Sequence, residues 1–158
     1  MSKCLVTGTF DPITLGHEEL IKKAIATFDE VSVAVLINPD KTPLFSEEER
    51  VSMIEETFGD KVEAFSFSGL AVDAAKCVGA SCLVRGVRAD ADIPYEIEMA
   101  DYNRAWGLET VFFFASEKLK DVSATAAREL LKRGVMPDSL MSERAKMLAV
   151  NYLEAKNG

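Results

Sequence analysis

The sequence has few of the residues and patterns that mark metal sites, disulfide scaffolds or membrane spans. Its 158 residues include one histidine and three cysteines, Cys4, Cys77 and Cys82, an odd number without the spacing of a zinc site. The longest apolar runs, 31–37 and 111–115, are far shorter than the roughly 20 residues that cross a bilayer. The amino-terminal segment also lacks the pattern of a secretory signal. We therefore expect a reduced, cytoplasmic protein with no metal ligands of its own and no membrane partner.

The charge balance argues against another class of partner. Acidic residues outnumber basic ones by 26 to 18, which leaves a net charge of −8. Proteins that bind nucleic acids or anionic membranes depend on clustered lysines and arginines, so we expect no nucleic-acid partner. A phosphate ligand remains compatible with this charge, because it needs only a few local cations and backbone N–H groups.

Short β-branched apolar runs alternate with helix-period segments along the chain, with no repeat, linker or low-complexity tract between them. Strands are expected at 3–7, 31–37, 62–66, 82–85 and 110–114. Helices are expected at 17–27, 46–58, 70–78, 93–106, 123–132 and 142–155. Strands separated by helices form βαβ units, whose sheets are mostly parallel. The pattern predicts a single α/β domain over 1–158, an open sheet of about five parallel strands with helices on both faces, and the last helix packs on it.

Open parallel sheets bind ligands beyond the carboxyl ends of their strands, and the first such loop has unusual features. It reads Gly8-Thr-Phe-Asp-Pro-Ile-Thr-Leu-Gly-His17, which is neither a P-loop nor a G-x-G-x-x-G fingerprint. Gly8 and Gly16 allow a ligand close to the backbone. Thr9 and Thr14 offer hydroxyls, and the helix start offers unpaired N–H groups. His17 could donate to a phosphate oxygen, although a lone histidine is otherwise often a structural residue at a helix end.

The loop after the fourth strand contains Arg85-Gly-Val-Arg88, two cations around a glycine in an acidic protein. Arginine forks bind phosphate through paired hydrogen bonds, and the glycine lets a ligand approach the chain. The alternative is a salt bridge to a nearby acid, Asp90, Asp92 or Glu96. On the surface such a pair would contribute little to stability.

Two further loops at the same edge carry polar groups. Lys41 follows the second strand, where it is either a phosphate ligand or a solvated side chain. Ser123 and Thr125 open the fifth helix, where each could cap the helix or present its hydroxyl to a phosphate. Together the four loops describe a site the size of a triphosphate.

The fourth helix is expected to begin at Asp92, a residue type that caps helices, followed by a proline in the first turn. Large side chains recur along this helix at helical spacing: Tyr95, Met99, Tyr102 and Trp106. Such a stripe could line a ligand site, but a core or a subunit face is more typical.

Three segments resemble the signatures of one enzyme family. Thr14-Leu-Gly-His17 resembles the [H/T]-x-G-H motif of the nucleotidyltransferase superfamily, and 122–128 resembles its I-S-S-T-x-x-R motif. The most specific segment is 85–104, which is similar to the R-G-[LV]-R-x-x-x-D-x-x-Y-E-x-x-x-x-x-x-N-R pattern of bacterial phosphopantetheine adenylyltransferases. Segments 38–41 and 67–73 also fit, so the resemblance covers nearly the whole chain.

The resemblance implies a Rossmann-like fold, a homohexamer and one reaction. That reaction is the reversible transfer of the adenylyl group from ATP to 4′-phosphopantetheine, which gives dephospho-coenzyme A and pyrophosphate and requires Mg2+. The nucleophile is the substrate's own phosphate, so we expect no covalent enzyme intermediate. Catalysis is then left to positioning and electrostatic stabilisation.

By motif, the resemblance also implies a role for each matching residue. The implied catalytic residues are His17, which would stabilise charge on the α-phosphate, Lys41 and Arg88. The implied ATP contacts are Thr9, Phe10, His17, Gly86, Val87, Arg88, Glu96, Leu119, Lys120, Asp121, Val122, Ser123, Ala124 and Thr125. The implied phosphopantetheine contacts are Thr9, Lys41, Ala71 and Arg85.

The sequence departs from the family pattern at three places. Thr7 replaces a frequent proline, and Ala71 is smaller than usual. Segment 119–125 replaces an aromatic-rich segment that ends in I-S-S-S, so residues 119–121 are matched by position only. Two other functions are kept as alternatives. One is a related nucleotidyltransferase that acts on nicotinamide mononucleotide or, with CTP, on a phosphorylated alcohol, which the form of 123–128 favours. The other is a regulatory module that binds a nucleotide without turnover.

Overall fold

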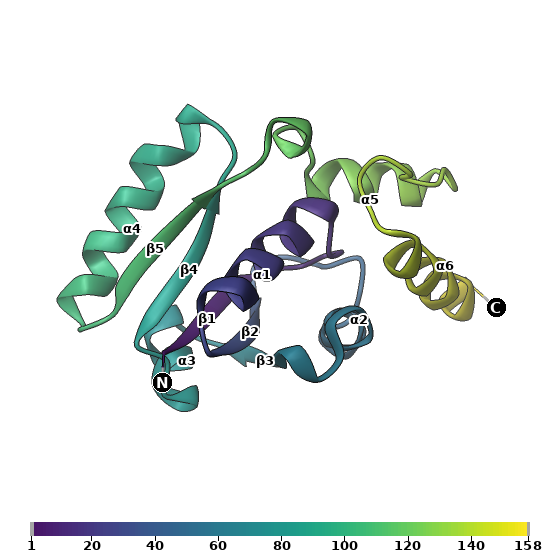
Figure 1. Cartoon of the computed structure of the whole chain (residues 1–158). Helices are drawn as coiled ribbons and strands as arrows, with labels where there is room; N and C mark the ends of the chain where they lie inside the picture. The colour runs from purple at the N-terminus through teal and green to yellow at the C-terminus, as the bar shows by residue number, and fades with distance from the viewer. Residues whose placement is uncertain (1, 158) are drawn as a thin grey trace.

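The computed structural model describes residues 2–157, in which five strands form a central sheet and six helices surround it (Figure 1). The strands are β1 (Lys3–Gly8), β2 (Glu30–Ile37), β3 (Glu63–Ser68), β4 (Cys82–Val87) and β5 (Glu109–Phe114). The helices are α1 (Leu15–Thr27), α2 (Glu47–Phe58), α3 (Ala71–Val78), α4 (Ile93–Ala105), α5 (Ala124–Lys132) and α6 (Glu143–Asn157). All strand pairs are parallel, in the Rossmann-like order β3-β2-β1-β4-β5. Within this part of the chain, no helix has the length and apolar character needed to cross a membrane.

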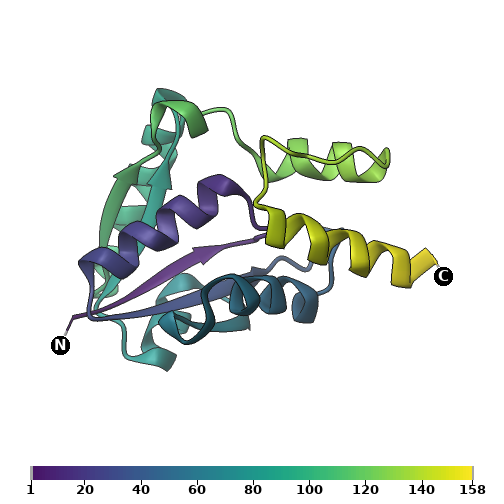
Figure 2. The same ribbon diagram turned by 45° about the vertical axis from the view of Figure 1, so that its right-hand side comes forward.

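The hydrophobic core consists of two clusters on opposite faces of the sheet, and successive side chains of β1 point alternately into one and the other. Cys4 and Val6 face a cluster that includes side chains of α1, α2, α5 and α6, whereas Leu5 faces a smaller cluster with α3. This alternation is what a strand covered on both faces requires. Figure 2 shows α5 and α6 beyond the carboxyl edge of β1, so these two helices extend the first half of the core past the end of the sheet.

The predicted fold class is confirmed. Each predicted strand and helix corresponds to an observed one, and its first and last residues differ from the observed bounds by no more than two positions. The start of α2 shows that residues a few positions apart in the sequence can determine where a helix begins. The Ser46 hydroxyl accepts the Glu49 N–H at 3.1 Å, and the Glu49 carboxylate accepts the Ser46 N–H at 2.9 Å, which is a capping box. The sequence pattern does not predict the single-turn 3-10 helices at Gly59–Lys61, Asp90–Asp92 and Glu117–Leu119.

As predicted, Asp92 occupies the N-cap position of α4 and a proline follows in the first turn, but the Asp92 side chain does not cap the helix. Asp92 already has helical backbone angles (φ −76°, ψ −24°), because the 3-10 turn at Asp90–Asp92 runs directly into α4. Its carboxylate instead accepts hydrogen bonds from the N–H groups of Arg88 and Ala89, both at 3.2 Å. Asp92 therefore fixes the turn after β4, which carries Arg88.

The sheet opens between β1 and β4, where the strand order reverses. Pairing of β1 with β4 ends at Val6 and Val84. On their outer sides, β1 stays paired with β2 as far as Gly8, and β4 stays paired with β5 as far as Val87. The carboxyl ends of the two central strands therefore diverge, and open α/β sheets bind their ligands in the crevice at such a switch point.

Candidate active site

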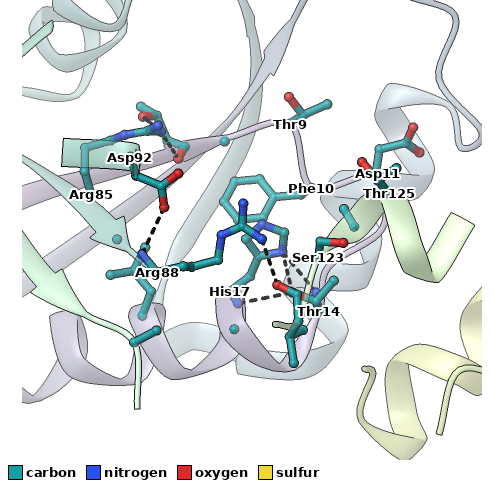
Figure 3. A pocket seen from close by; sticks show the side chains of 18 of the residues that line it. Thr9, Phe10, Asp11, Thr14, His17, Arg85, Arg88, Asp92, Ser123 and Thr125 are labelled. Atoms are coloured by element: carbon teal, nitrogen blue, oxygen red, sulfur yellow. Dashed lines mark hydrogen bonds between the residues drawn. The ribbon is translucent and has the colours of Figure 1, made fainter. Parts of the chain in front are cut away.

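A cavity of about 790 Å3 lies at the opening between β1 and β4. Its walls come from the carboxyl ends of β1, β2, β4 and β5 and from the start of α5. His17, Lys41, Arg85 and Ser123, each from a different segment, line this one cavity. In Figure 3, His17 and Phe10 lie between Arg88 on one side and Ser123 on the other. The four loops that the sequence marks for phosphate binding are thus brought together.

The loop between β1 and α1 fixes the orientation of the His17 ring. Thr14 is the N-cap of α1, and its main-chain N–H donates to His17 Nδ1 at 3.0 Å (Figure 3). Phe10 packs edge-on against the imidazole, with ring centroids 4.9 Å apart. Because Nδ1 accepts the Thr14 N–H, the proton of the neutral ring resides on Nε2. His17 can therefore donate one hydrogen bond from Nε2.

The surroundings also keep His17 uncharged at neutral pH. Burial, followed by the nearby guanidinium groups of Arg88 and Arg85, lowers the pKa of His17 to about 4. Desolvation disfavours the charged ring, and two like charges disfavour it further. The residue is therefore a hydrogen-bond donor without a charge, and the two arginines supply positive charge to the site.

The pKa of His17 can be measured directly because the chain has a single histidine. In protein without a histidine tag, we expect the imidazole NMR signals to stay constant from about pH 8 to about pH 5.5 and to shift only closer to pH 4. The pKa of His17 in the folded protein lies below the ordinary histidine value of 6.5. Because the unfolded chain binds a proton at His17 more readily than the folded protein does, His17 lowers the free energy of unfolding as the pH falls from 6.5 toward 4. Above pH 6.5 the residue is neutral in both states and causes no such loss. A titration midpoint near 6.5 would contradict this description of the site.

Arg85 lies between the sheet and α4. Its guanidinium donates to the Thr7 carbonyl at 3.1 Å and to the two carboxylate oxygens of Glu96 at 2.8 and 3.3 Å. The salt bridge considered as an alternative is therefore present, but it is not a surface pair. Glu96 is 6% exposed, and both residues line the cavity. Paired hydrogen bonds of this kind hold the guanidinium in one orientation.

Arg88 connects two walls of the cavity. Its guanidinium donates to the Val122 carbonyl at 3.1 Å, which ties the end of β4 to the start of α5. Ser123 caps α5, because its hydroxyl accepts the Ala126 N–H at 3.1 Å. The first turn of α5 still presents main-chain N–H groups, and such groups attract anions.

Comparison with known proteins decides between the related nucleotidyltransferases. A family model described as Cytidylyltransferase-like matches residues 5–130. The phosphopantetheine adenylyltransferase of Beijerinckia indica subsp. indica is 42% identical over 139 residues, which cover 82% of this chain and 83% of that protein. The enzyme of the same name from Flavobacterium johnsoniae is 40% identical over 148 residues, covering 89% and 97%. The chain belongs to the phosphopantetheine adenylyltransferase family. The resemblance based on segment 85–104 is thereby confirmed.

Solved structures of more distant proteins share the fold. Plasmodium falciparum nicotinic acid mononucleotide adenylyltransferase, complexed with NaAD, superimposes with a TM-score of 0.70 at 13% identity and covers 96% of this chain and 95% of its own. The lipopolysaccharide core biosynthesis protein of Thermoplasma volcanium GSS1 gives a TM-score of 0.55 at 24% identity, covering 73% and 97%. At these identities the likeness concerns the fold alone.

Two sets of residues that the family pattern implies lie outside the main cavity. Leu119, Lys120 and Asp121 do not line it, and Lys120 forms an exposed ion pair with Glu117 at 3.1 Å. Ala71 lines a second cavity of about 110 Å3 between α3, α4 and the sheet.

The two cavities share part of their walls. Thr7, Arg85 and Glu96 line both of them, so the two spaces meet at the Arg85–Glu96 pair. A ligand with a phosphate at this pair could therefore extend into either cavity.

Asp11, Arg50 and Arg128 are among the residues of the main cavity wall that were not singled out from the sequence. Arg50 follows three glutamates in α2, a pattern typical of a solvated helix face, yet it is 4% exposed. Asp11 and Arg128 stand in the matched motifs, and Arg128 Nη1 donates to the Asp11 carbonyl at 2.8 Å. The motifs therefore contain Asp11 and Arg128 without showing their contacts, whereas no local pattern marks Arg50, whose partners include the distant Thr9 carbonyl.

Proposed function

We propose that this protein transfers the adenylyl group of ATP to 4′-phosphopantetheine, giving dephospho-coenzyme A and pyrophosphate. The observation that carries the proposal is the single cavity lined by His17, Lys41, Arg85 and Ser123. It occurs in a chain 40–42% identical to named phosphopantetheine adenylyltransferases over most of its length.

In this reaction a phosphate oxygen of phosphopantetheine attacks the α-phosphorus of ATP. One P–O bond forms, the bond from the α-phosphorus to the oxygen bridging to the β-phosphate breaks, and its electron pair leaves with pyrophosphate. The attacking phosphate is already an anion, so the protein need not remove a proton. Its task is to hold two anions in line and to stabilise the charge that develops.

His17 is suited to the stabilising role. Its neutral Nε2–H can donate to a non-bridging oxygen of the α-phosphate as negative charge grows there. Lys41, Arg85 and Arg88 supply the positive charge that offsets the repulsion between the two substrates. Lys41 extends from an exposed loop, whereas the two arginines are held by the contacts described above.

We place the two substrates on either side of His17. ATP lies against Gly86, Val87, Arg88 and the first turn of α5, and the phosphate of phosphopantetheine lies between Lys41 and Arg85. The pantetheine arm then enters the second cavity beside Ala71. That cavity suits an amide-bearing chain, because it is lined by Asn103 and by Thr110, whose buried hydroxyl has no hydrogen-bond partner among residues 2–157. A role for Leu119, Lys120 and Asp121 in binding ATP stays a prediction.

Mg2+ enters this proposal as part of the MgATP substrate. Among residues 2–157, no group of three or more histidine, cysteine or carboxylate side chains is placed to hold a metal ion. The donor set therefore does not fit a resident site, whereas Mg2+ commonly binds substrate phosphates and water. We expect EDTA to abolish dephospho-coenzyme A formation and to leave the Tm of the nucleotide-free protein unchanged. A lower Tm in EDTA would contradict the absence of a resident metal.

The reaction is tested with purified protein and defined acceptors. Pyrophosphate should be released only when ATP and 4′-phosphopantetheine are both present, and mass spectrometry should identify dephospho-coenzyme A. Parallel reactions contain nicotinamide mononucleotide with ATP, or a phosphorylated alcohol with CTP. A failure to form dephospho-coenzyme A, or faster turnover of another acceptor, would refute the proposal.

We further propose a homohexamer in the cytoplasm. The stripe on α4 does not belong to the core of the chain, because Tyr95, Tyr102 and Trp106 are 60, 44 and 59% exposed. Its interpretation as a core face is therefore wrong. We propose a subunit face for the exposed part of the stripe, and the ligand-site interpretation stays open for Tyr95 and Met99, which line the second cavity. All three cysteines are free thiols, which suits a reducing compartment. Light scattering that gives the mass of a single chain would contradict the hexamer.

A further inference from the structure

Side chains hold all four main-chain polar groups of the segment Leu44–Phe45, between β2 and α2. Asp11 Oδ2 accepts the Leu44 N–H and Asp11 Oδ1 accepts the Phe45 N–H, both at 2.9 Å. Arg50 Nε donates to the Phe45 carbonyl at 3.0 Å, and Lys156 Nζ donates to the Leu44 carbonyl at 2.9 Å. Because side chains supply these partners in place of a helix or a strand ladder, they determine where the segment lies.

Arg50 also reaches the loop on the other side of the cavity. Its Nη1 donates to the Thr9 carbonyl at 3.1 Å, while its Nε holds the Phe45 carbonyl. The side chain is 4% exposed, and its planar guanidinium offers donors in a fixed arrangement. One buried group thus links the loop after β1 to the loop before α2.

Asp11 makes a second link between the same two loops, and this link extends to His17. The Asp11 carboxylate holds Leu44–Phe45, and the Asp11 carbonyl accepts from Arg128 at 2.8 Å. Between Thr9 and Asp11, Phe10 has a φ of +50°, a left-handed conformation that a bulky residue rarely adopts. The hydrogen bonds on either side hold Phe10 in place, and its ring packs against that of His17.

We propose that Asp11 and Arg50 form a bridge that sets the distance between the two substrate sites, and that both are positioning residues for adenylyl transfer. The inference rests on the proposed function, in which the loop after β1 carries His17 and the loop after β2 carries Lys41. Reacting atoms must lie about 3–3.5 Å apart and in line, and a shift of about 1 Å can cost about 100-fold in rate. A rigid link between the two loops meets this requirement by fixing where each loop lies.

Arg50→Met tests the bridge, because it removes the donors and keeps a side chain of similar length. We expect kcat to fall about 10- to 100-fold, while the Kd values for ATP alone and for 4′-phosphopantetheine alone stay within about threefold of wild type. Binding stoichiometry should remain one site per chain. Arg50→Lys keeps the charge but can reach only one of the two carbonyls, so it should recover part of kcat.

Asp11→Asn tests the second link, because it replaces one acceptor oxygen with an N–H donor. It should lower kcat in the same way as Arg50→Met. The effects of the two substitutions should not multiply in the double variant, because both act through one bridge.

Lys156→Met is the matched control. Lys156 binds the same segment from α6 and pairs with Glu49, but it makes no contact with the loop after β1. It should lower the Tm and leave kcat near wild type. The bridge is refuted if Arg50→Met keeps wild-type kcat, or if Lys156→Met lowers kcat as much. It is also refuted if kcat falls in Arg50→Met only together with substrate affinity or with the number of binding sites.

A different outcome would separate the bridge from the proposed function. Wild-type protein that forms no dephospho-coenzyme A would refute the function alone. The bridge is then judged by amide hydrogen exchange. Arg50→Met must accelerate exchange in both loops, at Phe10 and at Phe45, whereas Lys156→Met must accelerate it at Phe45 only. Unchanged exchange in Arg50→Met would refute the bridge.

Discussion

Replacing His17 with alanine should lower kcat by about 10²- to 10³-fold and leave the affinity for ATP within about twofold of wild type. The Nε2–H is proposed to act on an oxygen whose negative charge grows only as the new bond forms. An interaction of this kind stabilises the transition state more than the bound substrate. Initial rates and calorimetric titration with ATP give the two quantities.

His17→Gln is the informative companion variant, since its amide supplies an N–H donor without the ring and should recover part of kcat. The pH profile gives a second check. Because the pKa of His17 is about 4, the kcat/KM of the wild type should show no change from His17 ionisation near neutral pH. If kcat and ATP affinity fell together in His17→Ala, the residue would serve binding, and a nucleotide-binding module without turnover would be the better description.

Replacing Arg85 with methionine should have the largest combined effect on activity and stability. The substitution removes a proposed anchor for the substrate phosphate, and we expect the KM for 4′-phosphopantetheine to rise by about 100-fold. It also leaves the Glu96 carboxylate, which is 6% exposed, without its charged partner. Because Arg85 itself is partly exposed, leaving this carboxylate without its partner should cost about 1–3 kcal/mol in the free energy of unfolding.

The two effects of Arg85→Met can be separated with a double variant. Arg85→Met with Glu96→Met removes both charges, so it should recover most of the free energy of unfolding without recovering the KM. Arg104→Met is a matched surface control, because Arg104 pairs only with exposed carboxylates on Asp101 and Glu109. It should change stability by about 0.5 kcal/mol or less. Recovery of the KM in the double variant would show that Arg85 acts through folding alone.

The parts of the fold that the sequence predicts are those set by neighbouring residues. The β-branched runs of β1 and β2, and the Ser46–Glu49 capping box of α2, are patterns that a few adjacent positions determine. The same local pattern places Asp92 at the start of α4 but does not show that its side chain leaves the helix uncapped, since an N-cap residue type followed by proline also fits a 3-10 turn that continues into a helix.

The residues of the site that lie near strand ends could be predicted from the sequence. The residues whose positions depend on tertiary contacts could not. Arg85 lies near the carboxyl end of β4, and His17 lies in the first turn of the helix that comes after β1, so their meeting at one sheet edge follows from the parallel order. Arg50 could not be recognised, because its burial depends on the carbonyls of Thr9 and Phe45. The neutral state of His17 depends on its burial and, next, on two arginines about 70 residues away in the chain, and no motif records either cause.

The most direct test is a crystal structure with dephospho-coenzyme A, because this product joins the two substrates across the bond that is made. We expect the diphosphate of the product within hydrogen-bond distance of His17 Nε2 and beside Arg85 and Lys41, with adenosine toward Arg88. The pantetheine arm should enter the space beside Ala71. A product bound elsewhere, or bound with its diphosphate away from His17, would contradict the idea that these separate turns form one site for adenylyl transfer.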